Sequence, residues 1–331
     1  MVGVLSALVA STPPAAVSNL VLKPAAVSVQ APDANGPVEK EFQQLLADDD
    51  AAQAEADKWI RDNNDFTTQG AGTPKAELNQ RILARFAAVR KSYDDFLQRH
   101  PDHARARLAY ASFLEDIHDE EGAAAQMGKS LELDPKNPAV WNNLANYYGE
   151  HGPVEKAFDY YAKAIELNPN ESVYYHNYGT TVYLFRQDAM AHFKITEQQV
   201  FDKALDLYAS AMKLAPDDFP LATEIAQTYY AIQPLRTNAA LKMWTNALQI
   251  AHDETEREGV QLHFARVKLM AGRLDEARDH LSAVTNGMYA ELKRRLTKVL
   301  ADKENAAKPA NAPPVSTNPP APPADPSTPA R

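Results

Sequence analysis

The chain has 331 residues, a formal net charge of −10 and no cysteine. Phosphate recognition needs a concentrated basic surface, so this charge argues against a nucleic-acid-binding protein. The absence of cysteine excludes disulfide bridges, zinc sites built on thiolates and thiol nucleophiles. Only 12 glycines, with a middle region rich in Ala, Leu and Glu, favour an all-α fold.

The first 37 residues are predicted to be a leader followed by a Pro/Ala-rich linker. The apolar run from Val2 to Ala10 is too short to span a bilayer. Small residues and prolines follow this run, as they follow the apolar part of a secretory signal, although no basic segment precedes it. The pattern predicts an exported, periplasmic protein. The alternative is a cytoplasmic protein with an apolar leader.

A 34-residue period begins after the leader and a first pair of predicted helices. Blocks 104–137 and 138–171 each carry a proline near their end, and a third block opens at Ser172. The middle block places small and large apolar residues at steps of three and four on two helices, which are separated by a Gly-Pro break. These residues are Trp141, Leu144, Ala145 and Tyr148, then Gly152 and Pro153, then Ala157, Tyr161 and Ala164.

This block resembles the tetratricopeptide repeat (TPR). The family pattern is W-x2-L-G-x2-Y in the first helix (helix A), then A-x3-F/Y-x2-A in the second (helix B), then a proline. Residues 138–171 match every position except that Ala145 replaces the glycine. The resemblance implies an α-solenoid, a right-handed superhelix of stacked helix pairs. Small side chains such as Ala145, Ala157 and Ala164 would let two antiparallel helices approach closely.

The resemblance extends from residue 38 to residue 304. The predicted units are a divergent pair at 38–103, repeats at 104–137, 138–171, 172–218, 219–253 and 254–287, and a capping helix at 288–304. Residues 305–331 are predicted to be a disordered tail, because proline fixes its own φ and lacks an amide donor.

The 172–218 unit departs from the family pattern by 13 extra residues, Gln187–Gln199. Thr196 and Gln199 have the spacing of a capping box, so a helix is predicted to begin near Glu197. The preceding helix is expected to run from Ser172 to about Phe193, which would give a long hairpin with a projecting tip. Its apolar residues either contact a partner or only pack the hairpin against the array: Phe193, Ile195 and Phe201.

The resemblance also implies a concave, peptide-binding groove lined by helix A. Family groove positions carry amide, hydroxyl and tyrosine side chains here, which suit the backbone of an extended peptide. For each residue the alternative is a solvated helix face. Carried onto this sequence, the candidate groove residues are Arg105, Ser112, Glu115, Asn142, Asn146, Glu150, His176, Thr180, Tyr183, Thr223, Gln227 and Tyr230.

A narrower TPR function, binding of chaperone C-termini, is not expected. Asn143 and Asn177 match the single asparagine of the carboxylate-binding pattern. The basic positions of that pattern are instead occupied by Leu108 or Asn142, and by Val173 or Pro220. Without these cations a terminal carboxylate would lack its charge-assisted hydrogen bonds.

Catalytic signatures are missing from the sequence. It contains no HExxH, GxSxG or Walker motif, so we expect no catalytic residues, no metal and no cofactor. The predicted function is a non-enzymatic scaffold that binds a partner protein or extended peptide, with no nucleic acid and no integral membrane span. Two alternatives stay open. One is an envelope-associated spacer or assembly factor tethered by its tails, and the other is a small-molecule-binding or accessory subunit of an enzyme complex.

Overall fold

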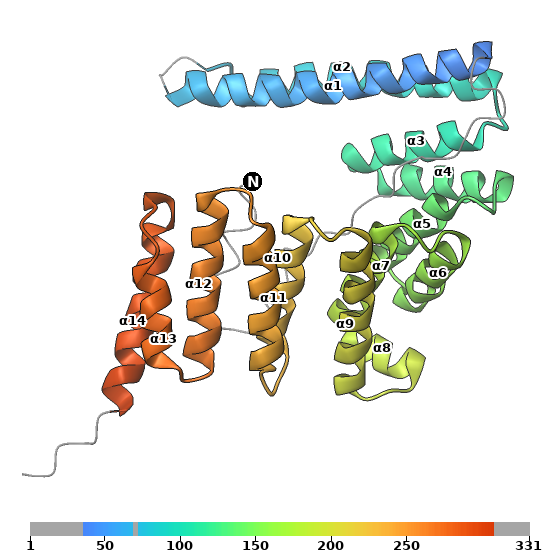
Figure 1. Cartoon of the computed structure of the whole chain (residues 1–331). Coiled ribbons are helices and arrows are strands. Elements are labelled where there is room, and N and C mark those ends of the chain that lie inside the picture. The colour runs from blue at the N-terminus through green and yellow to red at the C-terminus, as the bar shows by residue number, and fades with distance from the viewer. Residues whose placement is uncertain (1–35, 69–71, 308–331) are drawn as a thin grey trace, which may run out of the picture. The chain divides into compact units, whose positions relative to one another are not determined.

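The computed structural model of the protein describes residues 36–68 and 72–307 (Figure 1). Within these ranges the chain forms fourteen α-helices and two 3-10 helices, without a strand, which confirms the predicted all-α class. The predicted leader, almost all of its linker and most of the Pro-rich tail lie outside the described residues. No helix in the described ranges combines the length and low polarity that a membrane span requires.

The chain divides into two compact units, with the boundary between Ile232 and Gln233, inside the block predicted as the 219–253 repeat. The first unit contains α1 (Pro37–Thr68), α2 (Lys75–Arg99), α3 (Ala104–Asp116), α4 (Glu120–Leu133), α5 (Pro138–His151), α6 (Val154–Leu167), α7 (Ser172–Leu184), α8 (Arg186–Phe193), α9 (Glu197–Leu214), α10 (Phe219–Thr228) and η3 (Tyr229–Ala231). The second contains α11 (Thr237–Ile250), α12 (Glu254–Met270), α13 (Leu274–Ser282), η4 (Gly287–Tyr289) and α14 (Ala290–Ala307).

Helix pairs are the building blocks of the first unit. α1 packs on α2, α3 on α4, α5 on α6, and α7 on α9. Neighbouring pairs contact each other through α4 with α5 and through α6 with α7. Each pair therefore buries its apolar stripe partly within itself and partly against the next pair, as stacked repeats do.

Small residues line the contact between α5 and α6. Ala145, Ala157 and Ala164 are all 0% exposed, so the predicted role of these positions in close helix packing is confirmed. Tyr161 is also completely buried among them. Because the side chain of each alanine is only a methyl group, the two backbones can approach closely, and the tyrosine fills the remaining space.

Aromatic rings of α5 and α6 also pack against one another. Trp141 and Tyr148 of α5 both contact the ring of Tyr160 edge-on, at centroid distances of 5.0 and 5.4 Å. Gly152 ends α5 at a φ of +73°, a conformation that glycine adopts without a steric penalty. Pro153 lies one position before the first residue of α6.

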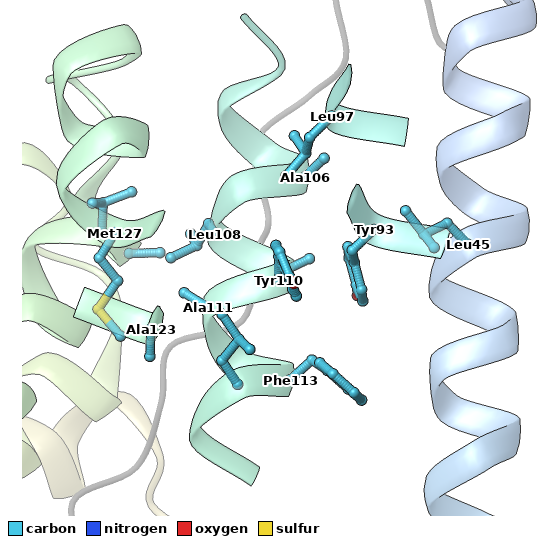
Figure 2. Close-up of a cluster of buried hydrophobic side chains, with 14 of the residues drawn as sticks. Leu45, Tyr93, Leu97, Ala106, Leu108, Tyr110, Ala111, Phe113, Ala123 and Met127 are labelled. Carbon is cyan, nitrogen blue, oxygen red and sulfur yellow. The ribbon is translucent and has the colours of Figure 1, made fainter. Parts of the chain in front are cut away.

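The N-terminal pair is joined to the first repeat by an aromatic core. Tyr93 of α2 stacks on Tyr110 of α3, with ring centroids 4.8 Å apart and planes inclined by 6°. Figure 2 shows Tyr110 and Phe113 on the side of α3 nearer Tyr93, and Leu108 on the side nearer Met127 of α4. The helix α3 is thus apolar on two sides, as expected of a helix packed between neighbouring pairs.

The extra residues of the 172–218 unit do not form the expected continuous helix from Ser172 to Phe193. α7 ends at Leu184, because Phe185 takes a non-helical conformation (φ −100°, ψ 51°), and the separate helix α8 follows. The predicted start of the next helix is confirmed: Thr196 caps α9 and forms a capping box with Gln199.

A histidine stacked on a tryptophan marks the core of the second unit. The ring of His263 on α12 lies 3.9 Å from that of Trp244 on α11, nearly parallel to it. Glu258 on α12 accepts hydrogen bonds from the backbone amides of Thr285 and Asn286, at 2.9 and 2.6 Å. These bonds hold the turn after α13 against α12.

Candidate partner-binding surface

Buried polar side chains are concentrated on the first helices of four successive repeats, α3, α5, α7 and α10, here termed the helix A row. Of the thirteen buried polar or charged residues in the described part of the chain, eight lie on three of these helices. They are Asn142, Asn143, Asn146, His176, Asn177, Thr180, Thr181 and Thr228. The facing helices α4, α6 and α9 bury apolar side chains, tyrosines and the single polar residue Ser130.

Four of these residues form the asparagine cluster, defined as Asn142, Asn143, Asn146 and Asn177. The side-chain amide of Asn177 on α7 donates to the side-chain oxygens of Asn142 and Asn146 on α5, at 3.1 and 3.2 Å. Asn142 in turn donates to Asn143 at 3.1 Å. The cluster therefore crosses from one repeat to the next, and its members hold each other's orientation.

The second helix of the repeat, α6, hydrogen-bonds to the asparagine cluster through Tyr161. The hydroxyl of Tyr161 on α6 donates to the side-chain oxygen of Asn146 at 2.8 Å, and Thr181 donates to the Tyr161 oxygen at 3.2 Å. Burial raises the pKa of Tyr161 well above its ordinary value, so the phenol keeps its proton and remains a donor. The predicted core tyrosine thus also positions Asn146, one of the predicted groove residues.

Further along the row, α7 is joined to α10 by polar contacts. The hydroxyl of Tyr183 donates to the backbone oxygen of Thr228 at 2.9 Å. The Nε2 atom of His176 on α7 lies 3.0 Å from Oε1 of Glu224 on α10. Within its own repeat, Thr180 shares a hydrogen bond with the hydroxyl of Tyr208 on α9. Side chains predicted to line the groove therefore also link consecutive repeats.

The N-terminal end of the row is acidic. Burial, reinforced by the neighbouring carboxylates Glu150 and Asp116, raises the pKa of Glu115 to about 7, while His151 opposes the shift. Burial also raises the pKa of Asp116, and that of Asp49 on α1, where Asp116 adds to the effect. Carboxylates from α1, α3 and α5 therefore act on one another electrostatically.

The structure places the predicted groove residues at different depths. Asn142, Asn146, His176, Thr180, Tyr183 and Tyr230 are buried, and Glu150 is exposed. The half-buried residues are Arg105, Ser112, Glu115, Thr223 and Gln227. Arg105 forms an ion pair with Glu39 of α1 at 2.8 Å. The prediction that these residues contact a partner remains a proposal.

Asn177 and Glu224 of the row were not among the predicted groove residues, and neither were Asn143, Thr181 and Thr228. Asn177 joins the asparagine cluster and Glu224 contacts His176. A signal for Asn177 was present in the sequence, because it lies 34 residues after Asn143, at the same repeat position. No comparable repeat signal marked Glu224.

The three predicted tip residues pack within the unit rather than projecting together. Phe193 lies 5.2 Å from the ring of Phe158 on α6, and Lys203 of α9 places its ammonium 4.4 Å from the Phe193 ring. Phe201 is only 2% exposed and Ile195 is half-buried. His192 approaches Asp159 of α6, so α8 lies back against the preceding repeat.

Among the residues that the structure describes, no group of three or more histidine and carboxylate side chains is arranged to hold a metal ion.

Comparison with known families supports the repeat assignment. The sequence model of the tetratricopeptide repeat matches residues 127–158, which run from α4 through α5 into α6. The TPR resemblance inferred from block 138–171 is therefore confirmed. The match covers α5, which carries three members of the asparagine cluster.

Curated relatives match part of the chain. The Photosystem I assembly protein Ycf3 of Acaryochloris marina is 32% identical over 92 residues, which are 27% of this chain and 55% of that protein. The protein of the same name from Cyanophora paradoxa is 29% identical over 124 residues, 35% of this chain and 64% of that protein. The chain thus spans less than two thirds of the length of these relatives.

Solved structures of similar fold include pilF of Pseudomonas aeruginosa, which is 17% identical, with coverage of 78% of this chain and 100% of that chain and a TM-score of 0.47. Another is YrrB, described as a TPR protein with an unusual peptide-binding site. It is 14% identical, with coverage of 64% of this chain and 97% of that chain and a TM-score of 0.47.

Proposed function

Because the chain contains tetratricopeptide repeats, we propose that it is a non-enzymatic scaffold that holds an extended segment of a partner protein along the helix A row. The observation that carries this proposal is the concentration of buried amide and hydroxyl side chains on α5 and α7. Their partner helices, α6 and α9, bury only apolar side chains and tyrosines. Burying polar groups costs free energy that an apolar core would avoid. Their restriction to one helix of each pair supports a role in binding.

The chemistry of the asparagine cluster suits a peptide backbone. An amide side chain offers both donors and acceptors, and an extended peptide presents both at regular intervals. Asn142, Asn143 and Asn177 are at most 1% exposed, so their bonds fix α5 against α7 and orient Asn146, which is 8% exposed, before a partner arrives. Such preorganisation reduces the entropy lost on binding.

The test is a pair of double variants measured for partner capture. Asn142→Ala with Asn177→Ala alters the cluster, whereas Asn170→Ala with Asn238→Ala removes two exposed asparagines as the matched control. We expect the first pair to reduce recovery of the bound partner and the control pair to leave it unchanged. Circular dichroism establishes that both remain folded. Equal recovery from folded forms of both pairs would count against the proposal.

A second candidate is that the bound partner is a subunit of a complex under construction. It is favoured by the two relatives named Photosystem I assembly protein Ycf3, each of which matches part of this chain. An assembly factor should bind its partner before incorporation and be absent from the finished complex. Size fractionation of the captured partner tests this: recovery only from the mature complex would remove the assembly role.

A further inference from the structure

The helix A row carries more negatively charged than positively charged side chains. Its four helices carry four carboxylates: Glu115, Asp116, Glu150 and Glu224. They carry only two permanent cations, and both are engaged elsewhere. Arg105 pairs with Glu39 at 2.8 Å, and Arg107 donates to the backbone oxygen of Pro101 and to Gln126.

Two of the carboxylates form no ion pair, because the nearby His151 is paired with Glu120. Neither Glu115 nor Glu150 forms an ion pair or hydrogen bond within the described part of the chain, although burial and mutual repulsion raise the pKa of Glu115 to about 7. They lie on the first helices of consecutive repeats. Two unneutralised carboxylates near one another disfavour the charged state until a cation approaches.

A second and independent feature lies farther along the same row. The His176 side chain is buried, with 1% of the residue exposed, and its Nδ1 atom has no hydrogen-bond partner in the described structure. Its Nε2 atom is 3.0 Å from Oε1 of Glu224, but the pair lacks the alignment of a hydrogen bond. A buried polar atom without a partner is unfavourable, so this pair gains from a ligand group that satisfies it.

We propose that the segment held along the helix A row is basic, with one lysine or arginine side chain between Glu115 and Glu150 and another against Glu224. This inference rests on the proposed function and specifies the chemistry of its ligand. A cation brought between carboxylates forms charge-assisted hydrogen bonds, which are stronger than neutral ones. The asparagine cluster lies on α5 and α7, between the α3 and α10 ends of the row, where it would fix the two helices beneath the intervening backbone.

The experiment uses the full chain and three blocked peptides that differ only in charge: alternating Ser-Lys, Ser-Gln and Ser-Glu sequences of equal length. Binding is measured by fluorescence anisotropy. We expect the order Ser-Lys, then Ser-Gln, then Ser-Glu. The double variant Glu115→Gln with Glu150→Gln should weaken Ser-Lys binding by roughly tenfold or more and leave Ser-Gln binding unchanged.

The control changes the same number of charges on helix B. Glu121→Gln with Glu132→Gln alters two exposed carboxylates of α4 and should affect Ser-Lys binding much less than the groove pair. An equal loss in both double variants would mean that the peptide responds only to the overall negative charge, which would overturn the inference.

Failure of this inference is distinguishable from failure of the proposed function. If Ser-Gln and Ser-Lys bind equally, and both are weakened by Asn142→Ala with Asn177→Ala, the groove stands and its basic specificity is wrong. If none of the three peptides binds, both proposals fail.

Discussion

Asn177 on α7 donates its side-chain amide to the side-chain oxygen of Asn142 on α5, 35 positions earlier in the chain, at 3.1 Å. This bond crosses the junction between two repeats, where stacked helix pairs usually meet through apolar side chains. It makes one residue responsible both for the stability of the junction and for the orientation of a predicted contact residue.

Replacing Asn177 by alanine should therefore weaken the junction. The change removes the bonds to Asn142 and Asn146, and at about 1 kcal/mol for each we expect a loss of roughly 2 kcal/mol in the free energy of unfolding. Urea unfolding followed by circular dichroism measures it. The exposed Asn170→Ala serves as the control, with an expected change below about 0.5 kcal/mol. Similar values for the two variants would show that the cluster contributes little to stability.

Two glycines in helices should respond to alanine in opposite directions. A Cβ at Gly179 of α7 would lie 3.0 Å from two ring carbons of Tyr208 and 3.2 Å from the backbone oxygen of Ala204. We expect Gly179→Ala to destabilise the protein by about 1–3 kcal/mol, because the close-packed α9 must move. At Gly128 of α4 nothing lies within 4 Å, so Gly128→Ala should stabilise by about 0.5–1 kcal/mol. Thermal unfolding of both variants measures the change in stability. Stabilisation by Gly179→Ala would contradict the packing of α7 on α9.

His263 should make the second unit sensitive to acid. Burial, with a smaller contribution from Arg266, lowers the pKa of His263 to about 3. The folded unit therefore binds fewer protons than the unfolded chain between pH 3 and about 6.5. Stability from the neutral ring is present above about pH 6.5 and is lost by about 1.4 kcal/mol per unit as the pH falls below it.

The measurement is urea unfolding at pH 7.5, 6.5 and 5.5 for the wild type and for His263→Phe, which retains a ring against Trp244. The free energy of unfolding of His263→Phe should not show this decrease as the pH falls. Parallel profiles for the wild type and His263→Phe would show that this ring does not titrate with unfolding.

The sequence predicted the local features of the repeats well. The small residues at Ala145 and Ala157 are buried where the 34-residue pattern places them, and Thr196 caps α9 as its spacing with Gln199 indicates. These features depend on residues of one repeat or one helix end, so a single stretch of sequence contains the information.

Features that depend on contacts between distant segments were not predictable in the same way. The break at Phe185 has no glycine or proline to mark it, and the position of Phe193 against Phe158 depends on how α8 packs on α6. The contact of His176 with Glu224 depends on the register between α7 and α10. Helical periodicity gives the face of each residue on its own helix but not the residue opposite it.

The most direct test of the central claim is a site-specific crosslink to the partner in the native host. Because the chain contains no cysteine, one introduced cysteine can carry a single photoreactive group. Gln227→Cys places it on the helix A row, and Ala162→Cys places it on the exposed side of α6. We predict a crosslinked partner peptide from position 227 and none from position 162. Crosslinks from position 162 alone, or equally from both positions, would contradict binding along the helix A row.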